Sequence, residues 1–250
     1  MKALVTGASS GIGRSISKYL DSLGYEIILV SRDKEKLEET KLELKNKSKI
    51  VVMDLSDMNN LKSLYVLVKN ENIDILVNCA GFGIYGEFDK TDMNKELEMI
   101  DLNIKTVHVL TKLFLKDMKK RNSGYILNVS SIAGHLPGPL MDAYYASKSY
   151  VYVLSTSINE ELRKDRSNVK VGTLNPGPVR TNFNNVANVK FSMHSLTSEY
   201  VAKYTVEKML KGKVDITPGL DIKFLRFAAK IVPDNLMAKM VHVRQTRKRK

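Results

Sequence analysis

Three side chains capable of acid–base chemistry lie within a short stretch of the chain. Tyr144 and Lys148 are four residues apart, a spacing that places both on one face of a helix. A phenol has a free pKa of roughly 10, and a neighbouring ammonium favours the phenolate and lowers that pKa. The pair could therefore exchange a proton with a carbonyl oxygen. Ser131 follows the apolar run Tyr125 to Val129, so its hydroxyl could hold the same oxygen.

A Tyr-x-x-x-Lys pair also occurs on ordinary solvated helix faces, so its interpretation needs support from elsewhere. A glycine-rich turn, Thr6-Gly7-Ala8-Ser9-Ser10-Gly11-Ile12-Gly13, joins the apolar run 2–5 to a helical pattern over about 12–23. Glycines allow close approach of a pyrophosphate, and the following helix N-terminus offers N–H groups and partial positive charge. The spacing is Gly-x-x-x-Gly-x-Gly rather than Gly-x-Gly-x-x-Gly, and an ordinary turn is the alternative.

The second apolar run, 26–30, ends in Ser31-Arg32-Asp33. An acidic side chain at this place would favour the ribose 2′-hydroxyl of NAD. The planar, permanently charged guanidinium of Arg32 instead suits the 2′-phosphate of NADP. Asp33 is expected to cap the next helix. The alternative for Arg32 is a surface arginine without a ligand.

Apolar runs alternate with helical patterns along most of the chain. The predicted strands are 2–5, 26–30, 50–53, 73–77, 125–129, 169–174 and 214–217. The predicted helices are 12–23, 34–47, 56–70, 91–121, 142–163 and 198–211. This alternation predicts an α/β fold: one Rossmann-type, doubly wound, parallel seven-stranded sheet with helices on both faces. Residues 1–219 form the catalytic domain, in which the aperiodic segment 182–196 is a candidate lid.

Composition narrows the class of protein. The chain has 250 residues, one cysteine and four scattered histidines, which argue against a disulfide framework and a metal site. The N-terminal apolar run is too short for a signal peptide, and no apolar stretch is long enough to span a membrane. The cytoplasm is the expected location. The net charge of +13 indicates a lysine-rich surface, and without interleaved aromatic residues it does not favour nucleic acid.

From residue 220 the chain becomes amphipathic and then basic. Apolar positions 222, 225, 229, 232, 236, 240 and 241 predict one or two helices interrupted at Pro233, followed by a basic tail. This extension, 220–250, could contact a membrane surface, form an oligomer contact, cover the site, or pack on the body with a disordered tip.

Several motifs occur in an order and spacing that resemble the short-chain dehydrogenase/reductase family, over about residues 1–219. The glycine turn is similar to its cofactor turn, and Asn78-Cys79-Ala80-Gly81 is similar to its Asn-Asn-Ala-Gly motif, with cysteine at the second position. Asn103, Ser131, Tyr144 and Lys148 match its catalytic tetrad, and Pro176-Gly177 with Thr181 matches its nicotinamide motif. Only Tyr144, not Tyr145, has the required spacing to Lys148.

The resemblance implies NADP(H)-dependent interconversion of a ketone or aldehyde and an alcohol. Tyr144 would be the general acid/base, Ser131 would position the carbonyl oxygen, and Lys148 would lower the Tyr144 pKa and bind the nicotinamide ribose. Asn103 would hold a relay water. The implied cofactor-binding residues are Gly7, Ser9, Ser10, Gly11, Ile12, Gly13, Arg32, Asp54, Leu55, Asn78, Ala80, Gly81, Tyr144, Lys148, Pro176, Gly177, Val179 and Thr181. No metal is implied.

The substrate and assembly are less constrained. Apolar residues at 183, 191, 193 and 196, with 135–140 opposite, favour a hydrophobic carbonyl compound such as a steroid or acyl ketone. The resemblance implies a homodimer or homotetramer. A non-catalytic NADP(H) sensor or scaffold is the competing function, disfavoured by the intact Ser131, Tyr144 and Lys148. A sugar-nucleotide epimerase or dehydratase would need a larger domain after the sheet.

Overall fold

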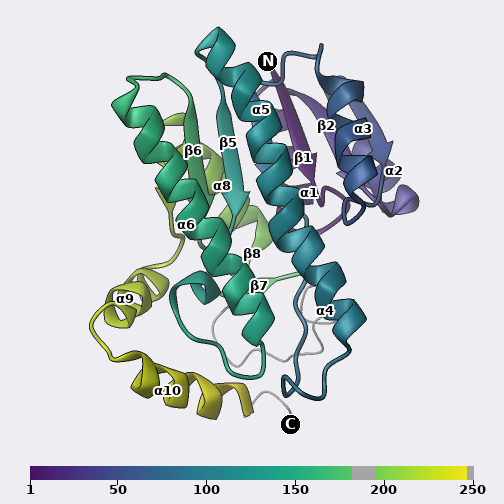
Figure 1. Ribbon diagram of the computed structural model, residues 1–250. Helices are drawn as coiled ribbons and strands as arrows, with labels where there is room; N and C mark the ends of the chain where they lie inside the picture. The colour runs from purple at the N-terminus through teal and green to yellow at the C-terminus, as the bar shows by residue number, and fades with distance from the viewer. Residues whose placement is uncertain (182–194, 247–250) are drawn as a thin grey trace.

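The predicted sheet is confirmed. The computed structural model describes residues 1–181 and 195–246 and contains a parallel seven-stranded sheet in the order β3-β2-β1-β4-β5-β6-β9 (Figure 1). The strands are β1 Lys2–Thr6, β2 Glu26–Ser31, β3 Ser48–Val52, β4 Ile75–Asn78, β5 Tyr125–Val129, β6 Lys170–Leu174 and β9 Asp215–Ile216. The strand order reverses direction at β1, between β2 and β4. Because ligands of open α/β sheets bind where the order reverses, this edge is the expected site.

Helices cover both faces of the sheet, as the alternation predicts. One face packs against α1 Gly11–Ser22, α2 Lys34–Leu42 and α8 Ser198–Leu210. The other packs against α3 Met58–Val68, α5 Val107–Arg121 and α6 Asp142–Lys164. A minor sheet pairs β7 Val179–Arg180 with β8 Leu196–Thr197.

Helix boundaries follow side-chain caps. Asp33, Asp57 and Asp92 each accept a hydrogen bond from the first turn of the helix that follows, as such residues do at N-caps. The prediction that the helix after Asp33 continues to residue 47 is wrong, since α2 ends at Leu42. The Asp21 carboxylate accepts the Lys45 and Asn46 backbone N–H groups, both at 2.9 Å, and so holds this segment in a turn.

The long helical region before β5 is interrupted. It consists of α4 Met93–Ile100, a π-helical segment Asp101–Thr106 (η1) and α5. Asn103 lies within η1 and is fully buried. The interpretation of Asn103 as an interior amide at a local distortion is therefore confirmed, in keeping with the frequent occurrence of π-bulges at functional sites.

The C-terminal extension forms two helices, α9 Leu220–Ala229 and α10 Asp234–Thr246, on either side of Pro233. Figure 1 shows α10 beyond the end of the sheet toward which β5 points. The predicted apolar face is only partly right: Val241 is buried, but Leu236 and Met240 are more than half exposed. The buried positions of α10 are Met237, Val241 and Gln245, which are spaced by four residues. Within residues 1–181 and 195–246, no helix combines the length and apolar character needed to cross a membrane.

Candidate active site

A cavity of about 790 Å³ extends along the carboxyl ends of the strands. Its walls come from the glycine turn, the loops after β2 to β6, the start of α6, and α10. Of the residues proposed from the sequence, those that line it are Gly7, Ser9, Ser10, Gly11, Ile12, Gly13, Arg32, Asp54, Leu55, Ala80, Gly81, Ser131, Tyr144, Lys148, Pro176, Gly177, Val179 and Thr181. Asn78 and Asn103 lie behind the wall.

The glycine turn brings three backbone segments into close contact. A β-carbon on Gly13 would lie 2.3 Å from the Gly7 carbonyl oxygen, and one on Gly7 would lie 2.9 Å from the Ala80 backbone. Gly7 and Gly11 have φ of +65° and +51°, values that side chains rarely adopt. The result is a bare backbone cradle at the N-terminus of α1, whose first-turn N–H groups have no partner within the helix. Such a cradle fits the pyrophosphate of a dinucleotide.

The end of β1 is tied to the end of β4 by one side chain. Thr6 Oγ1 donates to the Val77 carbonyl oxygen at 3.3 Å and accepts the N–H groups of Cys79 and Ala80 at 3.0 and 3.1 Å. This holds the Asn-Cys-Ala-Gly loop against the glycine turn. Loss of solvent around the Cys79 thiol raises its pKa to about 11, which agrees with a packing role rather than a nucleophilic one.

The far end of the cavity carries the residues expected near the adenosine. Ser9 Oγ and Ser31 Oγ are 2.9 Å apart. Arg32 lines the cavity with an exposed side chain and donates to Glu98 Oε1 at 3.0 Å. Asp54 accepts the Ser56 N–H at 2.9 Å, and this bond, more than the nearby Arg32, lowers its pKa.

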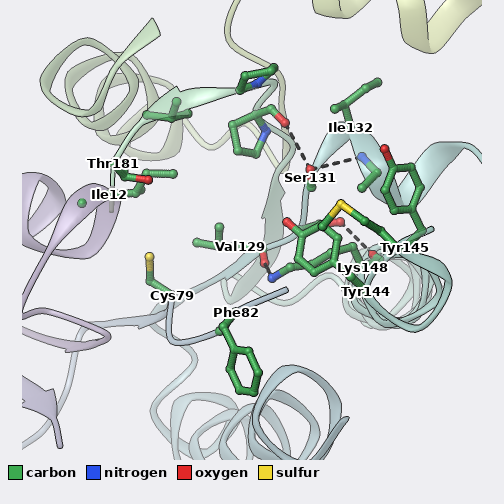
Figure 2. Close-up of a pocket in the computed structure, with 18 of the residues that line it drawn as sticks. Ile12, Cys79, Phe82, Val129, Ser131, Ile132, Tyr144, Tyr145, Lys148 and Thr181 are labelled. Carbon is green, nitrogen blue, oxygen red and sulfur yellow. Dashed lines mark hydrogen bonds between the residues drawn. The ribbon is translucent and has the colours of Figure 1, made fainter. Parts of the chain in front are cut away.

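Ser131, Tyr144 and Lys148 converge in the middle of the cavity (Figure 2). Ser131 caps a short 3₁₀ turn, Ile132–His135 (η2), by accepting the Ala133 N–H at 3.1 Å, and its hydroxyl also bonds to Tyr144. The Lys148 ammonium donates to the Val129 carbonyl oxygen at 2.9 Å and lies 5.8 Å from the centre of the Tyr144 ring. A carbonyl oxygen placed between the two hydroxyls could therefore receive both hydrogen bonds.

The pKa values in this group differ from the sequence-based expectation. The expectation that Lys148 lowers the Tyr144 pKa is wrong for the protein alone: loss of solvent raises that pKa, and the Ser131 hydrogen bond offsets only part of the rise. Burial instead lowers the Lys148 pKa to about 8. The reason is that loss of solvent penalises the charged form of each group, the phenolate of Tyr144 and the ammonium of Lys148.

The buried Lys148 makes stability depend on pH. Its pKa falls from 10.5 unfolded to about 8 folded, so below pH 8 the folded state carries the full cost of a buried ammonium. That cost disappears as pH rises from 8 to 10.5. Relative to Lys148→Met, the wild-type free energy of unfolding should therefore rise by roughly 3 kcal/mol across this window. Urea unfolding of both proteins at pH 7.5 and 10.5 measures the difference, and an unchanged difference would contradict the burial of a charged Lys148.

Asn103 does not line the cavity but supports the segments that carry the residues of the catalytic group. Its amide nitrogen donates to the Phe82 carbonyl oxygen at 2.9 Å and to Ser147 Oγ at 3.1 Å, and its oxygen accepts the Phe82 N–H at 3.2 Å. A β-carbon on Gly81 would lie 2.7 Å from Asn103 Oδ1 and 3.5 Å from Lys148 Nζ. The π-helical segment thus joins the loop after β4 to the helix that carries Tyr144 and Lys148.

Asn78 does not face the cavity. Its amide nitrogen donates to Asn128 Oδ1 at 2.8 Å and to Thr111 Oγ1 at 3.3 Å, and Asn128 in turn donates to Ser155 at 2.9 Å. This buried network connects β4, β5, α5 and α6. Asn128, Thr111 and Ser155 are not among the residues predicted from the sequence, although a polar Asn128 within the apolar strand 125–129 indicates a buried polar contact.

The remaining wall of the cavity is mostly apolar. Leu136 and Met141 line this wall. The His135 side chain instead points away from the cavity, with its Nε2 atom 3.2 Å from Asn175 Oδ1. The expectation that all of 135–140 faces the substrate is therefore wrong. Leu196 packs on the main core rather than the cavity. The expected lid residues Phe183, Phe191 and Met193 lie outside the described residues.

One side of this wall comes from α10, whose residues are not among the site residues predicted from the sequence. The residues of the C-terminal helices that line the cavity are Leu225, Met237, Met240, Val241, Val243, Arg244 and Gln245. Among the possibilities for the extension, the structure thus agrees with a cover over the site.

Comparisons with known sequences agree with this geometry. The model of the short chain dehydrogenase family matches residues 1–190. An oxidoreductase of Staphylococcus epidermidis is 36% identical over 182 residues, which cover 72% of this chain and 78% of that protein. Very-long-chain 3-oxoacyl-CoA reductases of Anas platyrhynchos and Homo sapiens are 33% and 36% identical over 76% and 64% of this chain, but only 63% and 54% of those proteins.

Solved structures share the fold. A short-chain dehydrogenase of Sphingobium yanoikuyae in complex with NADPH is 24% identical, with a TM-score of 0.84 and 95% of each chain covered. A short-chain dehydrogenase/reductase of Burkholderia phymatum in complex with NAD is also 24% identical, with a TM-score of 0.83 over 90% of this chain and 91% of that one. At this level of identity the likeness concerns the fold.

Proposed function

The chain belongs to the short-chain dehydrogenase family and is an oxidoreductase of that class, and from this premise we propose that it reduces a hydrophobic ketone or aldehyde with NADPH. The observation that carries the proposal is the convergence of Ser131, Tyr144 and Lys148 in a cavity that is continuous with the glycine cradle. The cofactor, when bound, supplies or accepts the hydride.

Residues of this chain would bind the carbonyl oxygen, donate the proton and position these groups. Ser131 and Tyr144 hold the carbonyl oxygen, and the Tyr144 phenol donates a proton to the alkoxide as it forms. Lys148, anchored on the Val129 carbonyl oxygen, fixes the helix face that carries Tyr144 and supplies positive charge beside the cofactor. Asn103 keeps the loop at Phe82 and α6 in register.

The choice of NADPH over NADH rests on Arg32. Its guanidinium lies at the cavity end where a ribose 2′-phosphate would bind, and Glu98 orients it. The Sphingobium structure with NADPH is in keeping with this choice, and the Burkholderia structure with NAD shows that the fold accommodates both cofactors.

The test of this choice is a fluorescence titration with each cofactor. Arg32→Ala should weaken NADPH binding at least tenfold, the loss of about one charge-assisted contact, while NADH binding changes less than twofold. Lys34→Ala, an exposed neighbour outside the cavity wall, is the matched control and should change neither. Equal affinities for NADPH and NADH in the wild type would contradict the proposal that NADPH is the preferred cofactor.

The apolar walls support a hydrophobic substrate. The 3-oxoacyl-CoA reductases among the relatives make an acyl ketone a sensible first choice. A panel of long-chain ketones and 3-oxoacyl thioesters, assayed by loss of nicotinamide absorbance, tests the activity. Turnover of none of them by a protein that binds NADPH would contradict this substrate class.

A further inference from the structure

Arg244 gives the substrate end of the cavity a positive charge. Among the described residues that line the cavity, only Arg32, Lys148 and Arg244 are cationic and only Asp54 is acidic. Asp54 and Arg32 interact at the cofactor end, and Lys148 lies in the catalytic group. Of these three cations, Arg244 is therefore the one that belongs neither to the proposed cofactor contacts nor to the catalytic group.

The chain offers Arg244 little to pair with. Arg244 takes part in none of the ion pairs found among residues 1–181 and 195–246. The sequence of 182–194 and 247–250 contains no aspartate or glutamate. A guanidinium at the rim of an apolar cavity, without an acidic side chain to neutralise it, is suited to an anionic ligand.

The turn of α10 that carries the exposed Arg244 is fixed by the residue that follows it. The Gln245 side chain is 1% exposed and donates to Tyr145 Oη at 2.9 Å. The Gln245 carbonyl oxygen accepts from Tyr85 Oη at 3.1 Å. Tyr145 stands edge-on to Tyr144, with ring centres 6.1 Å apart. The last turn of α10 is thus bonded to a residue that contacts the catalytic tyrosine.

The first helix of the C-terminal extension, α9, is also anchored. Arg226 of α9 makes a bidentate ion pair with Asp215 at 2.7 and 2.9 Å, and its guanidinium lies 5.4 Å from the centre of the Tyr152 ring. Between the two anchors, Met237 and Val241 are buried against the cavity. The C-terminal residues that line the cavity are therefore apolar except for Gln245 and Arg244, and Arg244 carries their one positive charge.

We propose that the substrate is an anionic amphiphile: an apolar carbonyl compound that carries a carboxylate or phosphate group, which pairs with Arg244. This inference rests on the proposed function, because it names the substrate class of the same site.

Binding of simple amphiphiles tests the proposal without a known substrate. Isothermal titration with decanoate, decyl phosphate and decanol compares ligands that share one alkyl chain but differ in whether they carry a negative charge. Each titration is done in the presence and in the absence of saturating NADP. At least one anion should bind about tenfold more tightly than decanol, a difference typical of one charge-assisted contact in a partly apolar site. The preferred anion distinguishes a carboxylate from a phosphate group.

Variants then show whether Arg244 is responsible. Arg244→Gln should abolish the preference for the anion and leave decanol binding within twofold, and Arg244→Lys should retain part of it. Lys239→Gln removes the same charge from an exposed position of α10 that does not line the cavity, so it should keep the preference and controls for attraction by the overall charge of +13.

Two results would overturn the proposal: equal affinity for anion and alcohol in the wild type, or an anion preference that survives Arg244→Gln. Both are distinct from failure of the proposed function, which would appear as absence of NADPH binding in the same wild-type protein. Retained NADPH affinity in Arg244→Gln shows that the variant is folded.

Discussion

Replacing Tyr144 with phenylalanine is expected to lower the rate of carbonyl reduction by roughly 10²- to 10⁴-fold, the usual contribution of a positioned general acid. The ring and its packing remain, so NADPH affinity should change little. Tyr150→Phe is the matched control, because Tyr150 lies on the same helix but is exposed and bonds to His108 instead of the catalytic group. A variant that keeps more than a tenth of the wild-type rate would exclude Tyr144 as the proton donor.

The pH profile of the same reaction gives a second readout. Loss of solvent raises the Tyr144 pKa above its ordinary value of about 10, so the phenol keeps its proton through pH 9. Reduction should therefore show no loss of activity from deprotonation of Tyr144 between pH 7 and 9. Measurement of kcat/KM over this range checks the direction of the shift in the free enzyme, and a loss of activity with a midpoint below pH 8 that is absent in Tyr144→Phe would contradict it.

The second large effect is expected at Gly13. A β-carbon there would lie 2.3 Å from the Gly7 carbonyl oxygen, which is backbone and cannot move without opening the turn. Gly13→Ala should lower the free energy of unfolding by about 3 kcal/mol, the upper part of the range for overpacking, and NADPH binding should be lost. Urea unfolding and the cofactor titration measure the two effects.

Gly24→Ala is the control for this substitution. Gly24 has φ of +87° but no heavy atom within 4 Å of the added carbon, so its cost of about 1 kcal/mol comes from the backbone alone. NADPH affinity should be unchanged. If Gly13→Ala cost no more than Gly24→Ala, the close contact between α1 and the glycine turn would not exist in solution.

The strands and the clustering of Ser131, Tyr144 and Lys148 could be predicted because their signals are local. Apolar runs fix the strands, the glycine spacing marks the turn, and the four-residue step from Tyr144 to Lys148 requires only a helix. Asn103 could be singled out because an asparagine in a long helical pattern is unusual, and the π-helical segment at that position explains it.

Features that depend on tertiary burial could not be predicted in the same way. The raised Tyr144 pKa and the lowered Lys148 pKa follow from the loss of solvent around both groups, which spacing does not reveal. The end of α2 depends on Asp21, more than twenty residues earlier. The exposed Met240 and the buried Gln245 reverse what hydrophobicity alone would assign, since α10 turns Gln245 toward Tyr145.

In the proposed reaction, hydride passes from NADPH to a carbonyl carbon while Tyr144 supplies the proton. The most direct measurement is turnover of an accepted long-chain ketone with NADPH that carries deuterium at the transferable position of the nicotinamide, followed by mass spectrometry of the product. We expect an alcohol with deuterium on its carbinol carbon from the wild type and almost none from Tyr144→Phe. NADPH binding without deuterium in any product would contradict it.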